Sequence, residues 1–152
     1  MAFSNIYHTA GRTLFANIFN KSVAIPATLY LGLRTLNGVA GNPADATLAD
    51  TLTSNLFEVP TAGTGYARIA VALNAANFPS SLSVAEALLI TAAQTYTFTN
   101  TVTGVTHSFW CTSPDNSGIL IWSNAIPSAI AKSFGNTDTY AVTPTIDFGA
   151  HA

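Results

Sequence analysis

Alternating apolar and polar positions predict short β-strands along most of the chain. In residues 28–35, Leu29, Leu31 and Leu33 alternate with polar or smaller neighbours, which is the period of a half-buried strand. Residues 66–73 alternate in the same way after a glycine-containing turn. These two segments are the clearest strands that the pattern predicts.

Further strands are predicted where β-branched and aromatic residues lie between turn-forming residues. These segments are residues 56–59, 96–100, 105–112, 118–124, 138–142 and 145–148. The turn-rich segment 113–118 should join two of them as a hairpin, and Pro144 restricts the last strand to a sheet edge or a strand start. Residues 82–91 fit either a short helix or a buried strand, and residues 37–53 are predicted to form a long loop.

The chain begins with a helical pattern at residues 4–19. Apolar residues recur four positions apart from Ile6 to Ile18, and Ser4 is suited to cap the first turn. Pro26 prevents the helix from continuing into the strand that follows. The sequence therefore predicts a short N-terminal α-helix ahead of the strands.

This order of elements predicts an all-β protein with one α-helix. Many short strands separated by turns are typical of an antiparallel β-sandwich or a jelly-roll-like fold. We expect residues 1–25 to form an N-terminal helical arm and residues 26–152 to form a single β-sandwich domain.

Composition adds that the surface is poor in charge. Only 8% of the 152 residues are Asp, Glu, Lys or Arg, whereas ordinary domains carry about 25%. Thr, Ser, Asn and Ala must cover the surface instead, and such a surface loses little solvation when a partner covers it. The composition favours a protein that assembles with other subunits.

Two classes of partner are disfavoured. The most apolar stretch, residues 84–93, is short and contains Glu86, so no membrane-spanning helix is expected. The chain has five Lys and Arg residues and no basic run, so nucleic acid is a poor candidate. The first residues lack the pattern of a secretory signal, and we expect synthesis in a cytoplasm.

Candidate chemistry is sparse, and we expect no enzyme. His8, His107 and His151 are too widely spaced for a zinc site, and Cys111 is the single cysteine. Cys111 is predicted to be a buried structural thiol on one strand face. No spacing indicates a catalytic centre, a metal site or a cofactor site.

Arg34 and Arg68 are the most informative charged residues. Each is predicted to project from the polar face of a strand in a chain with few cations. Each needs either an intrachain carboxylate, such as Glu58 or Asp147, or acceptors on another subunit. The sequence leaves both alternatives open.

Four short motifs resemble a family of small virion structural proteins of tailed bacteriophages. They lie at residues 28–33, 65–71, 105–109 and 118–122, and the similarity extends from about residue 14 to residue 148. Members of this family are described as head-decoration or tail-fibre-like proteins. The chain shows no fibrous repeat and no coiled-coil heptads.

The resemblance implies a location in the virion, assembled in the host bacterial cytoplasm. We expect a capsid decoration (cement) protein that binds the major capsid protein and associates with itself, with a trimer as the expected state. Phe3, Tyr7, Phe15 and Phe19 are candidate interface anchors beside Arg34 and Arg68. Packing of these aromatic residues on the subunit's own sheet is the alternative.

A tail-associated protein of a fibre, collar or baseplate is the alternative function. Such a protein would bind a host receptor or a carbohydrate through exposed aromatic rings. Trp110, Trp122, Tyr66 and Tyr140 are the candidates. A Trp110 ring exposed to solvent would favour the tail-associated function. A ring that faces a second layer of the fold would favour the capsid function.

Overall fold

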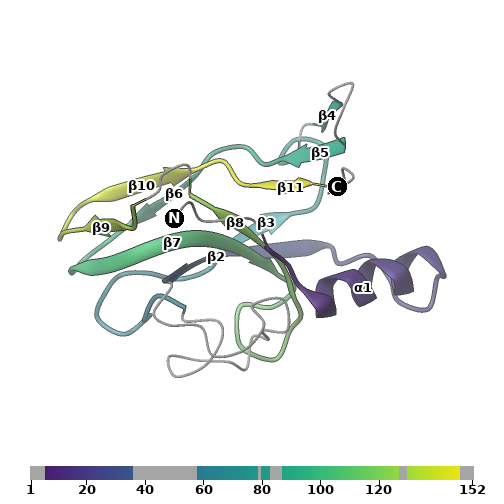
Figure 1. Ribbon diagram of the computed structural model, residues 1–152, viewed down its shortest axis with the longest axis horizontal. Helices are drawn as coiled ribbons and strands as arrows, with labels where there is room; N and C mark the ends of the chain where they lie inside the picture. Colours follow the sequence, from purple (N-terminus) through teal and green to yellow (C-terminus); the bar gives the residue numbers. More distant parts are fainter. Residues whose placement is uncertain (1–5, 36–57, 79, 83–86, 127–129, 148–152) are drawn as a thin grey trace.

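The computed structural model describes residues 6–35, 58–78, 80–82, 87–126 and 130–147. Antiparallel strands dominate these residues, together with one short helix (Figure 1). In chain order the elements are β1 (Ile6–Tyr7), α1 (Thr9–Phe19), β2 (Thr28–Thr35), β3 (Ile69–Ala72), β4 (Ser80–Leu82), β5 (Ala87–Ile90), β6 (Gln94–Thr97), β7 (Val102–Cys111), β8 (Leu120–Ala125), β9 (Lys132–Phe134), β10 (Thr139–Val142) and β11 (Thr145–Asp147). The predicted all-β class with a short helix is confirmed.

The largest sheet has six strands in the order β1-β8-β7-β2-β3, with β9 also paired to β7. All of its pairings are antiparallel. β7 lies at the centre because its ten residues pair with β2 and β8, as in Gly32 opposite Phe109 and Phe109 opposite Ser123. The predicted hairpin between β7 and β8 is confirmed.

Two smaller sheets lie over one face of the large sheet (Figure 1). They pair β10 with β6, and β11 with β5 and β4. Between the layers lies the main hydrophobic core, to which both layers contribute. Its largest members include Leu31, Leu33, Tyr66, Phe78, Tyr96, Phe98, Trp110, Trp122 and Ile146.

The opposite face of the large sheet is buried as well. Phe109, Cys111 and Leu120 form a second apolar cluster there. Residues 31–35 of β2 are all buried, although the strand was predicted to have one polar face. Arg34, which the alternation places on that polar face, has 0% exposed surface. The two-residue period is correct, but over residues 31–35 both sides of β2 are buried.

The start of the helix differs from the prediction. Ile6 and Tyr7 pair with Ser123 and Trp122 as strand β1, so α1 begins at Thr9 rather than at residue 4. His8 occupies the N-cap position without a side-chain capping bond, and its backbone N–H donates to Ile121. Ser4, the expected cap, lies outside the described residues.

Several predicted strands are confirmed, some of them with different bounds. The strand at 28–35 is confirmed as β2, while the strand predicted at 66–73 is limited to β3. Within the ambiguous segment 82–91, the described residues 87–90 form strand β5. β11 lies at the edge of its sheet, as Pro144 requires. Strands β1, β4 and β9 were not predicted, and residues 37–53 lie outside the described part.

Gly11 allows α1 to pack directly on β8. A Cβ atom at this position would lie 2.5 Å from the Ile121 carbonyl oxygen, closer than real side chains approach backbone atoms. Leu14, one turn later, is buried in the main core at 4% exposure. The helix is therefore fixed to the sheet by its first turns, and its outer end projects beyond the sheet (Figure 1).

We expect Gly11→Ala to destabilise the fold by about 1–3 kcal/mol. Alanine favours helices more than glycine does, but its methyl group would collide with the Ile121 backbone, which cannot move without disturbing β8. Urea unfolding followed by circular dichroism measures the change. Gly135→Ala is the control, because its Cβ would lie 3.5 Å from the nearest atom; a G11A protein as stable as the wild type would contradict the close packing.

Candidate functional site

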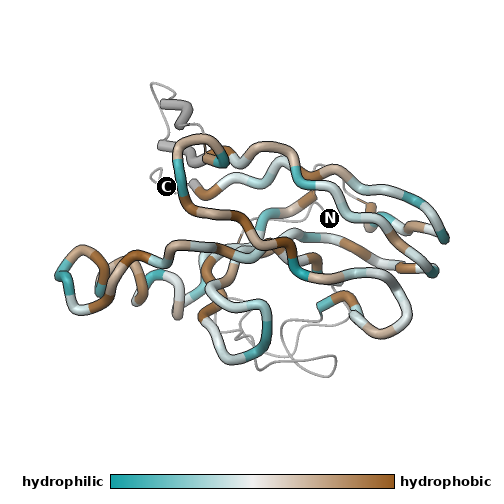
Figure 2. The backbone as a smooth tube through the Cα atoms, turned by 180° about the vertical axis from the view of Figure 1, so that it is seen from behind, coloured by the Kyte–Doolittle hydropathy of each residue, from teal (hydrophilic) through white to brown (hydrophobic). Residues whose placement is uncertain are grey.

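The outer end of α1 exposes large apolar side chains, which we call the helix tip: Phe19, Val23 and Ile25. Their exposed fractions are 84%, 43% and 64%. Hydrophobic and hydrophilic positions alternate along this projection, including its outer turn (Figure 2). Exposed apolar groups gathered on a projecting element are typical of an interaction surface.

The turn after α1 is held by hydrogen bonds, so the helix tip has a defined shape. Lys21 adopts a left-handed conformation with φ 61°. The backbone N–H groups of Lys21 and Ser22 donate to the carbonyl oxygens of Ile18 and Asn17, both at 3.0 Å. These bonds satisfy the last carbonyl groups of the helix.

The helix tip lies in a segment with only positive side-chain charge. Arg12 and Lys21 are exposed, and residues 6–27 contain no Asp or Glu. On the rest of the protein, Asp115 and Asp138 are exposed in turns. Hydrogen bonds from the Ser113 and Ser117 hydroxyl groups lower the pKa of Asp115 to about 2. Among the described residues, these exposed positive and negative charges therefore lie on separate segments of the chain.

The other predicted anchors pack within the chain. Tyr7 is half-buried and its ring lies 5.1 Å from Trp122 and 6.1 Å from Phe15, measured between centroids. Phe15 packs against the main core. Of the four candidates, Phe19 is exposed, Tyr7 and Phe15 stabilise α1 on its own sheet, and Phe3 lies outside the described residues.

Arg68 is the centre of an intrachain network, which confirms the intrachain alternative for this residue. Its Nε and Nη2 donate to the two carboxylate oxygens of Glu58, at 2.9 and 2.6 Å. The same guanidinium donates to the backbone carbonyls of Ser113 and Asp115 and to Asn116 Oδ1. We call these five residues the Arg68 network. It ties the turn between β7 and β8 to the residues that precede β3.

The Arg68 network also binds the hydroxyl group of a buried tyrosine. Tyr66 donates to Glu58 Oε1 at 2.7 Å and accepts a hydrogen bond from the Leu33 backbone N–H at 2.9 Å. Burial and the Glu58 carboxylate raise the pKa of Tyr66. Burial lowers the pKa of Arg68, but the hydrogen bonds and charge of Glu58 outweigh it and the pKa rises overall. Both groups therefore keep their protons and act as structural donors.

Arg34 has a different environment from Arg68. Its Nη1 lies 3.4 Å from Ser123 Oγ, whereas Nε and Nη2 have no hydrogen-bond partner among the described residues. Burial lowers the pKa of Arg34 to about 10. Glu58, one expected partner, pairs with Arg68, and the side chain of Asp147 is not described. Because Arg34 has no exposed surface, it is not available to a second subunit.

Most of the aromatic residues proposed to stack on sugars are buried. Trp110 and Trp122 are 0% and 1% exposed, and Tyr66 is 2% exposed. Trp110 faces the second layer, where its ring lies 5.5 Å from that of Phe78. Only Tyr140 is half-buried, so the expected cluster of open aromatic rings does not form from these residues.

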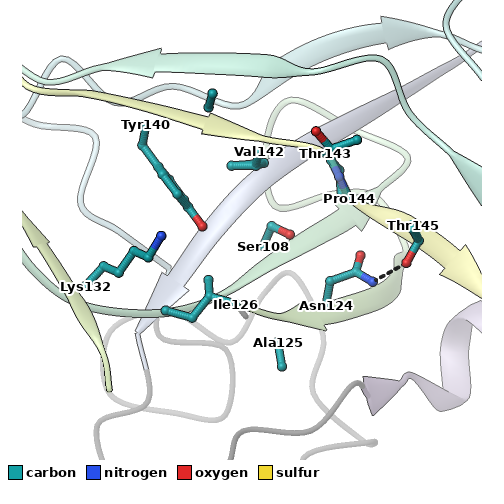
Figure 3. Close-up of a pocket in the computed structure, with 11 residues that line it drawn as sticks. Ser108, Asn124, Ala125, Ile126, Lys132, Tyr140, Val142, Thr143, Pro144 and Thr145 are labelled. Carbon is teal, nitrogen blue, oxygen red and sulfur yellow. Dashed lines mark hydrogen bonds between the residues drawn. The ribbon is translucent and has the colours of Figure 1, made fainter. Parts of the chain in front are cut away.

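Tyr140 lines a cavity of about 480 Å³ between the large sheet and the C-terminal strands (Figure 3). Lys132 and Tyr140 lie on one side of the cavity, and Asn124 and Thr145 lie on the other. Ser108, Ile126 and Val142 line the space between them. The spacing of these residues in the sequence gives no signal for the cavity, because β7, β8, β9, β10 and β11 each bring separate segments to it.

His8, His107 and Cys111 are buried, and each forms a hydrogen bond within the chain. Burial raises the pKa of Cys111 to about 11, so the thiol is protonated at neutral pH. His8 Nε2 and His107 Nδ1 lie 2.8 Å from the hydroxyl oxygens of Ser123 and Thr106, respectively. Among the described residues, no three His, Cys, Asp or Glu side chains come together as metal ligands.

No family model and no curated protein sequence matches the chain. Within the described part of the chain, no helix is both long and apolar enough to cross a membrane. Among the described residues, the helix tip and the cavity beside Tyr140 are two surface features suited to binding a partner or a ligand.

Proposed function

We propose that the protein is a non-enzymatic structural subunit of a bacteriophage virion, and that it decorates the capsid as a cement protein. The observation that carries this proposal is the helix tip, which presents Phe19 at 84% exposure on a helix that is fixed at its base. The resemblance of four sequence motifs to small virion proteins supports the phage assignment. The low charge of the chain fits a surface that other subunits cover.

The architecture suits this role. We propose that the large sheet and the two smaller sheets form a β-sandwich, a rigid body that holds the helix tip at a defined position. The proposed partner is the major capsid protein, and binding buries Phe19 and Ile25 across a junction between shell subunits. Cementing needs no reaction and no cofactor, because many such contacts must break together when the shell expands.

Self-association as a trimer is part of the proposal. The positively charged segment around Arg12 and Lys21 of one subunit would contact the acidic turns of the next, at Asp115 or Asp138. Such a contact joins two different surfaces, and a rotation of one third of a turn closes it into a ring. Analytical ultracentrifugation at low and high salt tests this arrangement, since the contact should weaken as salt screens it.

A tail-associated role is the second candidate, and the cavity beside Tyr140 favours it. Small ligands such as sugars bind in concave sites with a few convergent polar groups. This cavity has a lysine, an amide and several hydroxyl groups in its lining. The two roles place the protein at different positions in the virion, so binding to isolated capsids and tails separates them.

The test is co-sedimentation of the purified protein with capsids that lack it and with isolated tails. We expect saturable binding to capsids, and a higher temperature for capsid disruption. The double variant Phe19→Ser, Ile25→Ser should bind at least about tenfold more weakly, because it removes two exposed anchors. Ile130→Ser is the matched control, since Ile130 is also exposed, at 76%, but lies outside the helix tip.

Two outcomes contradict the proposal that the protein cements the capsid through its helix tip. Binding to tails alone would place the protein at the tail and favour the second candidate. Equal capsid binding by the wild type, the double variant and the Ile130→Ser control would show that the helix tip is not the attachment surface.

A further inference from the structure

The cavity beside Tyr140 contains a buried amide with an unused hydrogen-bonding atom. Asn124 is 7% exposed, and its Nδ2 donates to Thr145 Oγ1 at 3.2 Å (Figure 3). Its Oδ1 has no hydrogen-bond partner among the described residues. If the amide is turned over, the nitrogen takes this place, so one polar atom lacks a partner in either orientation. Buried polar atoms are normally paired, and a ligand can supply the missing partner.

The same cavity holds a cation without a counter-ion in the described part of the chain. Lys132 Nζ lies 4.8 Å from the centroid of the Tyr140 ring. The single salt bridge between described residues joins Arg68 to Glu58, and none of the residues that line the cavity is acidic. The cavity therefore favours a negatively charged group close to Lys132.

The remaining lining suits a ligand with several hydroxyl groups and one apolar face. Ser108, Thr143 and Thr145 contribute hydroxyl groups, while Ile126 and Val142 are apolar. The volume of about 480 Å³ lies within the range of about 300–1,000 Å³ that is common for small-molecule sites. A sugar ring combines hydroxyl groups at its rim with C–H groups on its faces, and an acidic sugar adds a carboxylate.

We propose that this cavity binds a uronic acid residue of a polysaccharide. The carboxylate pairs with Lys132, a ring hydroxyl donates to Asn124 Oδ1, and the apolar lining contacts the C–H face of the ring. The site is independent of the helix tip, and the proposal does not rest on the capsid role. A protein on the capsid and a protein on the tail can both use a site for this class of ligand.

The test is titration of the full-length protein with glucuronate, and with glucose as the neutral sugar of the same shape. Saturation-transfer NMR or calorimetry reports binding. We expect glucuronate to bind with millimolar affinity and glucose to bind at least about tenfold more weakly, because a charge-assisted hydrogen bond is lost. Lys132→Met should weaken glucuronate binding by a similar factor, since it keeps the apolar stem and removes the charge.

Two further variants sharpen the test. Lys21→Met removes the same charge at an exposed position in the turn after α1, and it should leave glucuronate binding unchanged. Asn124→Asp places a carboxylate opposite Lys132 and should abolish binding of glucuronate. Circular dichroism establishes that each variant is folded.

Three results would overturn the proposal. The first is equal binding of glucose and glucuronate, and the second is unchanged glucuronate binding by folded Lys132→Met. The third is the absence of saturable glucuronate binding at concentrations well above the millimolar range. None of these results bears on capsid attachment, which the helix-tip variants test separately.

Discussion

Arg68→Ala is expected to destabilise the protein by about 3–5 kcal/mol, because it removes one partner of a buried ion pair. The Arg68 side chain is 4% exposed, and the Glu58 side chain is 17% exposed. Without the guanidinium, the Glu58 carboxylate keeps only the Tyr66 hydroxyl group as a described donor. The backbone carbonyls of Ser113 and Asp115 lose the same partner. Urea unfolding at neutral pH measures the loss.

Arg68→Lys separates charge from geometry. A lysine keeps the positive charge, but its single nitrogen cannot pair with both Glu58 oxygens and also reach Ser113 and Asn116. We expect this variant to recover less than half of the stability lost in Arg68→Ala. Limited proteolysis gives a local readout, because the turn at residues 113–118 should become the first site of cleavage when Arg68 no longer binds it.

A double-mutant cycle with Glu58→Gln completes this test. If Arg68 and Glu58 act as a pair, their combined substitution should cost clearly less than the sum of the two single changes. Additive effects would show that the pair is not coupled. An Arg68→Ala protein within about 0.5 kcal/mol of the wild type would contradict the role of the network.

Trp110→Ala should cost a similar amount, about 3–5 kcal/mol, through a different mechanism. Trp110 is 0% exposed near the end of β7, and it packs on Phe78 between the layers. Truncation leaves a large cavity that the paired strands around it cannot close. Thermal or urea unfolding measures the effect, and Trp122 still provides a fluorescence signal in this variant.

Trp110→Phe is the matched control for the cavity. The indole Nε1 of Trp110 has no hydrogen-bond partner among the described residues. Phenylalanine removes this unsatisfied N–H group while it retains most of the ring, so the two effects partly cancel and the loss should stay below about 1.5 kcal/mol. Equal losses for the alanine and phenylalanine variants would indicate that ring packing at this position contributes little.

The sequence predicted strands correctly where the alternation or the turn residues that define them are neighbours in the chain. β2 was predicted with its observed bounds because its alternation is complete within eight residues. The β7–β8 hairpin was predicted because the turn residues 113–118 lie between two β-rich segments. The burial of Arg34 was not predictable, because alternation reports which residues share a face but not whether that face meets water.

Long-range pairing explains what the sequence did not show. Ile6 and Tyr7 fit a helical repeat, but they pair with residues of β8 more than 100 positions later and become β1. The cavity was missed for the same reason, because Asn124, Lys132 and Tyr140 belong to three separate strands or strand ends. Phe19 was identified as an anchor, but its sequence environment did not distinguish it from Phe15, which packs on the chain's own core.

The order of strands in the large sheet also constrains how the protein is made. β2 pairs with β3, the next described strand along the chain, but the other edge of β2 pairs with β7, which is synthesised much later. At ordinary rates of synthesis this edge stays open for several seconds. The nascent chain therefore exposes an apolar strand edge during translation, and the large sheet closes only when most of the chain has emerged. Expression at low temperature or with chaperones suits such a protein, because both limit aggregation through open strand edges.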